Sequence, residues 1–371
     1  MGALTPSLAL DDAALAWLGL ALVVELTPRR AFKLVERFGT PDAVLDATLS
    51  ALERADVPAE TAAAIREGRA RARTELASLA RAGARVVAWS DEAYPRQLRE
   101  IPDPPLVLAV RGTLVDDEPA VAVVGTRQAS EYGRRIAAEI ASGLAGVGVT
   151  VVSGLASGID GTAHQAALAA GGRTVAVFGT GIDRVYPRWH RELAESIVGQ
   201  GALVSEFPCG AEPMKFHFPR RNRVISGLAL GTVVVEAAEE SGSLITAKFA
   251  VEQNRDVFAV PGPADAPRHR GPNRLIREGA RLITCAKDVL EELLPALAPR
   301  LVERRAAAAE ASLTPSERRV FEAVGPDGGH VDEVIRRTAA PAPAVLETLL
   351  ALELRGLVHQ LPGKRFRRRA A

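Results

Sequence analysis

The segment from Lys215 to Ser226 carries the sharpest chemical pattern in the chain. One lysine and three arginines fall within nine residues, and Phe216 and Phe218 are interleaved with them. Pro219 suits the first turn of a helix. Guanidinium groups bind phosphates in a bidentate manner, and an aromatic face stacks on a base. The pattern predicts binding to a single-stranded nucleic acid, whose bases are free to stack, and a solvated basic turn is the alternative.

Small residues also gather where predicted strands end. Glycine lets backbone N–H groups approach an anion, and helix N-termini favour phosphate. Any single β–α turn needs small residues for its own geometry, so one turn is not informative. Six such turns together predict a ligand that carries phosphate. They are Val124–Arg127, Ser153–Asp160, Gly179–Asp183, Ser205–Pro208, Glu236 with Ser241–Ser243, and Pro261–Pro263.

Familiar enzyme and cofactor motifs are missing from the sequence. The first turn reads GTRQAS rather than GxGxxG, and the chain has no GxxxxGK[ST], HExxH or GxSxG pattern. No cofactor and no metal are therefore expected, and no catalytic residues are assigned. His164 and Glu206 stay open as acid–base groups, with a helix-surface histidine and a structural carboxylate as the alternatives.

The elements that must position these residues alternate between strand and helix. From residue 121, short valine-rich runs are separated by helical stretches such as Tyr132–Ala145 and Gly161–Ala170. Continuous apolar strands between helices predict an α/β domain with a doubly wound, mostly parallel, Rossmann-like sheet. The predicted strands are Val86–Trp89, Leu106–Val110, Val121–Val124, Val149–Val152, Thr174–Phe178, Ala202–Val204, Thr232–Val235, Asp256–Val260 and Arg281–Ile283.

Two smaller parts flank this domain. Residues 1–82 are predicted as an N-terminal helical domain, because apolar residues recur there at helical spacing. Its layout resembles a SAM or helix-hairpin-helix domain. Residues 83–295 form the Rossmann-like domain, with 83–120 as its lead-in, and 296–311 read as a partly helical linker. Residues 312–371 predict three helices and a hairpin, which is the layout of a winged helix. Its basic end, Lys364–Arg369, suits either nucleic-acid contact or a basic tail.

The composition indicates which ligands and which cellular compartment are expected for the protein. The chain has 46 basic and 45 acidic residues, so only local patches can bind nucleic acid. Its two cysteines, Cys209 and Cys285, lie far apart and predict neither a disulfide framework nor a zinc site. No signal sequence or apolar run long enough to cross a bilayer is seen, so a cytoplasmic protein with no membrane contact is expected.

The motifs in their order and spacing resemble the DprA/Smf family of DNA-processing proteins. One departure is His190, where the family usually has an asparagine three residues after Tyr-Pro. The resemblance covers the Rossmann-like part nearly end to end, and the two flanking parts match the family's accessory domains in layout. It rests on Val124–Arg127, Ser153–Asp160, Gly179–Pro187, Ser205–Pro208, Phe218–Ser226, Ser241–Ala247, Phe258–Gly262 and Gly271–Ala280.

The resemblance implies a non-enzymatic protein of natural transformation and recombination that binds and protects single-stranded DNA. It also implies that the protein helps load the RecA recombinase, displaces or works beside single-strand-binding protein, and forms a homodimer through the Rossmann-like domain. The dimer patch would lie in the region after Leu244. The implied DNA-binding residues are Arg127, Lys215, Phe218, Arg220, Asn222, Arg223, Ser243 and Thr246.

Two other functions stay open from the sequence. A related Rossmann-like fold occurs in nucleotide hydrolases, in which Glu236 or Glu206 would act on a ribosyl bond. The chain lacks the PGGxGTxxE-type turn of those enzymes. The winged helix could instead read duplex DNA through Pro343–Leu357, but that helix is mostly apolar or acidic, which suits packing or protein contact better than base readout.

Overall fold

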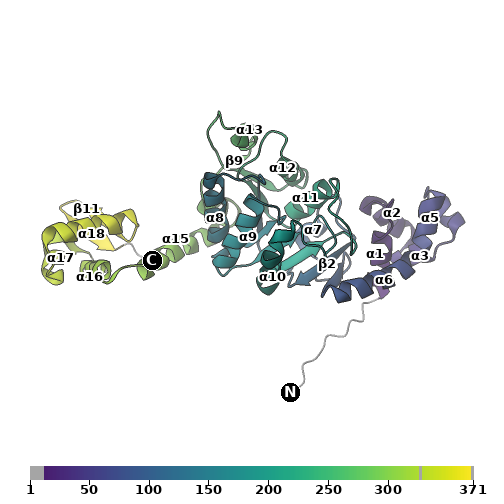
Figure 1. Cartoon of the computed structure of the whole chain (residues 1–371), viewed down its shortest axis with the longest axis horizontal. Coiled ribbons are helices and arrows are strands. Elements are labelled where there is room, and N and C mark those ends of the chain that lie inside the picture. Colours follow the sequence, from purple (N-terminus) through teal and green to yellow (C-terminus); the bar gives the residue numbers. More distant parts are fainter. Residues whose placement is uncertain (1–11, 326–327, 369–371) are drawn as a thin grey trace, which may run out of the picture. The chain divides into compact units, whose positions relative to one another are not determined.

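The computed structural model describes residues 12–325 and 328–368. Its contacts divide the chain into two units, Met1–Leu293 and Leu294–Ala371 (Figure 1). Residues 1–11 of the predicted N-terminal domain and Arg369 at the end of the predicted hairpin lie outside the described residues.

A nine-stranded sheet forms the centre of the first unit. Its strand order is β1-β2-β6-β5-β4-β3-β7-β8-β9. All neighbours from β6 to β9 are parallel, whereas the β1–β2 and β2–β6 pairs are antiparallel, so β2 alone runs against the other strands. The predicted mostly parallel sheet is confirmed. The strands are β1 Arg85–Ala88, β2 Val107–Gly112, β3 Ala120–Val124, β4 Thr150–Ser153, β5 Thr174–Val177, β6 Ala202–Ser205, β7 Gly231–Val234, β8 Asp256–Ala259 and β9 Arg281–Leu282.

Helices cover both faces of this sheet, as its continuous apolar strands require. One layer joins α8 (Glu131–Ala145), α9 (Ile159–Ala169), α10 (Arg191–Gln200) and α14 (Ala286–Leu293). The other layer packs α7 (Arg96–Arg99), α11 (His217–Gly227) and α12 (Gly242–Glu252) on the sheet through Leu98, Val224 and Ala247. Near the ends of β5 and β8 lie η1 (Arg188–His190), η2 (Pro267–His269) and α13 (Arg270–Arg277).

The order of strand addition reverses at β3. Strands β4, β5 and β6 follow on one side of β3, whereas β7, β8 and β9 lie on its other side. The helices after β3 and β7 therefore diverge to opposite faces of the sheet. Such a switch point opens a crevice at the carboxyl ends of the two strands, which is where open α/β sheets bind their ligands.

Helices precede the sheet, as the sequence predicted. Threonines cap α2, α3 and α4 by accepting backbone N–H groups, and α2 and α3 begin with proline. The rings of Trp17, Phe32 and Trp89 lie 4.9 to 5.9 Å apart, so these helices share a core with the β1 side of the sheet. The helices are α1 Asp12–Ala21, α2 Pro28–Phe38, α3 Pro41–Asp46, α4 Leu49–Glu53, α5 Ala59–Arg66 and α6 Gly68–Arg81.

The second unit has the predicted winged-helix layout. Residues 296–311 are helical, in η3 and α15. A capping box of Thr314 and Glu317 starts α16, and a three-stranded antiparallel sheet in the order β10-β12-β11 packs against the three helices that follow α15. The elements are η3 Pro295–Leu297, α15 Ala298–Ala311, α16 Pro315–Val324, β10 Gly329–His330, α17 Val331–Thr338, α18 Ala342–Leu354, β11 Val358–Leu361 and β12 Arg365–Arg368.

Candidate nucleic-acid interface

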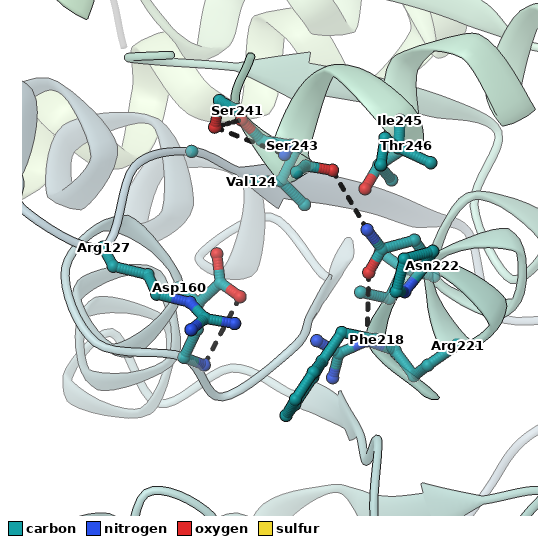
Figure 2. A pocket seen from close by; sticks show the side chains of 15 residues that line it. Val124, Arg127, Asp160, Phe218, Arg221, Asn222, Ser241, Ser243, Ile245 and Thr246 are labelled. Carbon is teal, nitrogen blue, oxygen red and sulfur yellow. Dashed lines mark hydrogen bonds between the residues drawn. The ribbon is translucent and has the colours of Figure 1, made fainter. Parts of the chain in front are cut away.

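A cavity of about 210 Å³ lies at the switch point between β3 and β7. We call it the switch-point cavity. Its walls come from the turn after β3, the start of α9, one side of α11 between Phe218 and Ile225, and the N-terminus of α12 (Figure 2). Five predicted residues from three distant segments meet here, namely Arg127, Phe218, Asn222, Ser243 and Thr246.

Arg127 and Phe218 both line this cavity and contact each other. The Arg127 guanidinium carbon lies 5.2 Å from the centre of the Phe218 ring, within the range of a cation–π contact. Arg127 is exposed on the turn after β3, whereas Phe218 is half-buried at the start of α11. An exposed cation beside a partly open aromatic face offers one partner for a phosphate and another for a base.

Arg221 is a cavity residue that the sequence reasoning did not select. It is buried, and it donates hydrogen bonds to the carbonyl oxygens of Gly154, at 2.9 Å, and Val177. Burial lowers the pKa of its guanidinium to about 10, while the nearby Asp160 carboxylate acts in the opposite direction. Arg221 therefore keeps its charge at neutral pH, and it lies 5.9 Å from the Phe218 ring on which Arg127 also packs.

Two glycines at strand ends make room for these side chains. A Cβ at Gly154 would lie 2.6 Å from an Arg221 nitrogen, and one at Gly179 would lie 2.8 Å from the Phe218 ring. Real Cβ atoms essentially never come this close, so a larger residue at either position would force the α11 side chain to move. The sequence reasoning assigned such glycines to phosphate contact through backbone N–H groups. The closeness of both glycines to large side chains of α11 is a property of the folded structure, and no local sequence signal separates Arg221 from Arg220 and Arg223.

Asn222 joins α11 to the N-terminus of α12. Its side-chain oxygen accepts a hydrogen bond from Arg221 Nε at 3.1 Å, and its amide nitrogen donates to the Gly242 carbonyl at 3.1 Å. Ser241 caps α12 and its hydroxyl lies 2.8 Å from that of Ser243. The positive end of this 11-residue helix therefore opens on the switch-point cavity, which favours an anionic group there.

Asp160 is the carboxylate that lines the cavity. Its Oδ2 accepts hydrogen bonds from the backbone N–H groups of Gly154 and Ala156, at 3.2 and 3.4 Å. Burial raises its pKa, whereas the Arg221 charge and these amides counter that effect. Asp160 thus holds the turn that starts α9 and balances the buried cation of Arg221.

The other three predicted residues lie outside the cavity lining. Lys215 is exposed just before α11. Arg220 reaches Glu206 at 3.2 Å with its side chain 47% exposed. Arg223 is buried, its guanidinium 2.5 Å from Glu206 and bonded to the Asp103 carbonyl. Only Lys215 and Arg220, of these three, present their charge to solvent.

The candidate acid–base groups are held in structural contacts. His164 is buried with Nδ1 2.6 Å from the Thr174 hydroxyl, and burial lowers its pKa to about 3. Glu206 binds the two arginines described above. Glu236 is fully buried and accepts hydrogen bonds from the Ser130 N–H and hydroxyl, at 2.9 and 2.5 Å. None of the three lines the switch-point cavity.

His190, the departure from the family pattern, contacts the turn after β4. Its Nδ1 lies 2.9 Å from the Leu155 carbonyl oxygen, so it fixes the turn that leads to Ala156 in the cavity wall.

In the described ranges, no helix is long and apolar enough to span a membrane. The same residues contain no cluster of three or more His, Cys, Asp or Glu that could hold a metal ion.

Comparison with known proteins identifies family models that match this chain. A model of DNA recombination-mediator protein A matches residues 85–294, and a model of the DprA winged helix domain matches residues 304–364. The chain is 44% identical over 293 residues to protein Smf of Escherichia coli, covering 77% of this chain and 78% of that protein. It is 37% identical over 367 residues to a putative DNA processing protein DprA of Mycobacterium tuberculosis, covering 90% and 93%.

Solved structures agree with this match. DNA processing protein A from Streptococcus pneumoniae superposes with a TM-score of 0.66 at 35% identity, covering 76% of this chain and 98% of that chain. The Helicobacter pylori protein, described for its single-stranded DNA binding mode, gives a TM-score of 0.51 at 26% identity, covering 58% and 98%. The sheet, the winged helix and these similarities together show that the chain belongs to the DprA/Smf family of DNA recombination-mediator proteins.

Proposed function

We propose that this protein binds single-stranded DNA in the switch-point cavity and helps load the RecA recombinase onto it. The observation that carries the proposal is the meeting of Arg127, Phe218 and the N-terminus of α12 around one cavity. The Helicobacter pylori relative, whose described property is a single-stranded DNA binding mode, supports the same ligand. RecA loading rests on membership of a recombination-mediator family.

The proposed binding mode separates phosphate from base. A phosphate would lie between Arg127 and the first turn of α12, where Ser243 and Thr246 add hydroxyl groups. A base would stack on Phe218, the half-buried ring of the cavity. Paired bases of a duplex are stacked on one another and do not reach such a ring, so the arrangement favours a single strand.

We assign the remaining predicted residues by their exposure. Lys215 and Arg220 would attract the strand along the rim of the cavity, because their charges reach solvent. Asn222 would orient Arg221 and α12. Arg223, which is buried against Glu206, would hold α11 in place rather than touch DNA.

We infer a binding protein without bond-breaking chemistry. This inference is supported by the carboxylates: Asp160 is bonded to backbone amides, and Glu206 and Glu236 point into structural contacts. Incubation with nucleoside monophosphates tests it, because a nucleotide hydrolase would release free base and a binding protein would not.

We also propose that the protein forms a homodimer. It would act in the cytoplasm, beside single-strand-binding protein. Beyond Leu244, the first unit exposes apolar side chains on α12 and β9, where Val251 is 63% and Leu282 54% exposed. These two side chains are the candidates from which a subunit contact in that region would be built. Sedimentation of the parent and of a V251E/L282E variant tests the dimer: the variant should sediment as a monomer, and an unchanged dimer would place the contact elsewhere.

A competition gel shift tests the DNA proposal itself. Single-stranded and duplex oligonucleotides of one sequence compete for the protein, and the single strand should win. Arg127→Glu should weaken single-strand binding and lower the slope of log affinity against log salt by about 1 or more. Preference for duplex, or parent-like binding by the variant across the salt series, would overturn the assignment.

A further inference from the structure

Two of the exposed aromatic side chains outside the cavity lining belong to one short segment. Trp189 is 75% exposed and Tyr186 is 43% exposed, in the segment that connects β5 to α10. The segment itself is well anchored. Thr180 donates to the Arg184 carbonyl at 2.6 Å, and the His190 N–H donates to the Pro187 carbonyl at 3.0 Å. The exposure therefore belongs to the rings and does not reflect a loose loop.

These rings continue from the switch-point cavity. The centre of the Tyr186 ring lies 5.7 Å from that of Phe218, so an aromatic series begins inside the cavity and reaches its mouth. Trp189 is three residues further along, and chain geometry limits its Cα to about 10 Å from that of Tyr186. We call Tyr186 and Trp189 the aromatic extension.

Positive charge accompanies the aromatic extension. Arg188 and Arg191 flank Trp189 and are exposed. Within the described ranges, neither makes an ion pair or a hydrogen bond through its guanidinium. Their charges are therefore free for a polyanion, in contrast to Arg184, which lies 3.5 Å from Glu212. Aromatic faces beside unpaired arginines are the two components with which proteins hold a single strand without reading its sequence.

We propose that the aromatic extension is a second stacking surface, over which single-stranded DNA continues after it leaves the switch-point cavity. The proposal rests on the proposed function of that cavity and extends it by naming the path of the strand. A base would stack on Trp189, and Arg188 and Arg191 would contact the adjoining phosphates. The ligand at this surface is the strand of any sequence, because every base has an aromatic face.

Tryptophan emission gives a direct readout in the full chain. The protein has three tryptophans, and Trp17 is 3% exposed within a ring cluster that includes Trp89, whereas Trp189 is 75% exposed. An oligodeoxythymidylate of about 16 nucleotides should quench the Trp189 emission as it binds. Trp189→Phe should remove this quenching and keep parent-like affinity, because phenylalanine preserves an aromatic face.

Trp189→Leu separates stacking from simple apolar contact. Leucine keeps an apolar side chain but has no aromatic face, so affinity for the oligonucleotide of about 16 nucleotides should fall about fivefold or more. A thymidine dinucleotide, which fills only the cavity, should bind the variant and the parent alike. Leu354→Ala, which removes an exposed apolar side chain from α18, is the matched control and should bind as the parent does.

The outcomes distinguish this inference from the proposed function. If the parent binds no single-stranded oligonucleotide at all, the proposed function of the cavity fails, and the extension with it. If the parent binds, but Trp189→Leu binds the longer oligonucleotide equally well and its addition leaves the parent's emission unchanged, the cavity assignment stands and the aromatic extension is wrong.

Discussion

Arg127 and Arg221 both lie close to the Phe218 ring, but they differ in their exposure to solvent. Arg127 is exposed, whereas Arg221 is buried and satisfied by Gly154, Val177 and Asn222. A sequence shows Arg220, Arg221 and Arg223 as equal members of one basic run. Successive helical residues point about 100° apart, so only the packing of α11 on the sheet decides which of them turns inward. The basic character of the site was therefore predictable from the sequence. Which arginines are buried and which are exposed was not.

This difference predicts opposite phenotypes for two alanine variants. Arg127→Ala should weaken single-strand binding and leave the free energy of unfolding nearly unchanged, because an exposed side chain is removed. Arg221→Ala removes the donor of the Gly154 and Val177 carbonyls and the buried cation that balances Asp160, so the free energy of unfolding should fall by about 3–5 kcal/mol. Urea unfolding and oligonucleotide titration of both variants measure the two effects. Equal stability losses would show that Arg221 is not the buried support described here.

His164 predicts an acid sensitivity of the fold. Burial, with the charges of His190 and Arg221, lowers its pKa from 6.5 to about 3 in the folded protein. The unfolded chain then binds a proton below pH 6.5 that the folded chain does not, so stability is lost as the pH falls from 6.5 toward 3. The loss should approach about 1.4 kcal/mol per pH unit within that window. Urea unfolding between pH 5 and 7 measures it, and His164→Gln should show a shallower dependence.

At the scale of elements, the valine-rich runs predicted the strands because burial on both faces leaves a continuous apolar signature. All nine predicted strands begin and end within two residues of those observed. The two-residue β10 was not predicted, because its pairing with β12 is a contact across the winged-helix fold and leaves no local pattern. The sequence predicted a phosphate-bearing ligand from six turns rich in small residues, and this stays a prediction. What it did not predict is that Gly154 and Gly179, in two of these turns, leave room for side chains of α11.

The turn after β5 provides a test of that finding. A Cβ at Gly179 would lie 2.8 Å from the Phe218 ring, so Gly179→Ala should displace the ring from the cavity. The binding free energy for single-stranded DNA should then become less favourable by about 1–3 kcal/mol, the value of one lost stacking contact. Oligonucleotide titration measures the loss. Phe218→Ala is the reference, and combining the two changes should add little, because both remove the same contact.

At the scale of the whole molecule, the switch-point cavity lies entirely within the first unit. The second unit has a winged-helix layout, but α18 exposes Leu346, Leu350 and Leu354 along one side. Base edges are read by polar side chains, so this helix is not suited to sequence readout. The layout was predictable from helical spacing and turn residues, and so was the apolar character of the helix.

Deletion of the second unit should therefore spare the proposed activity. A chain of residues 1–293 should bind single-stranded oligonucleotides with parent-like affinity, because every residue of the cavity and its rim is retained. Fluorescence anisotropy with a labelled oligonucleotide measures this, and circular dichroism of the shortened chain confirms that it folds. A large loss of affinity in a folded fragment would assign part of the binding to the winged helix.

The packing of the N-terminal helices on strand β1, which includes the ring cluster of Trp17, Phe32 and Trp89, bears on aggregation of the sheet. Strand β1 is one border of the sheet, and an uncovered border strand tends to pair with another chain and aggregate. Here, α1 and α6 pack against β1, and the opposite border, β9, is only two residues long. A minimal sheet domain obtained by trimming these helices would expose the apolar side of β1 along with its free backbone groups. We therefore expect a chain trimmed of α1 and α6 to self-associate more readily than the parent chain.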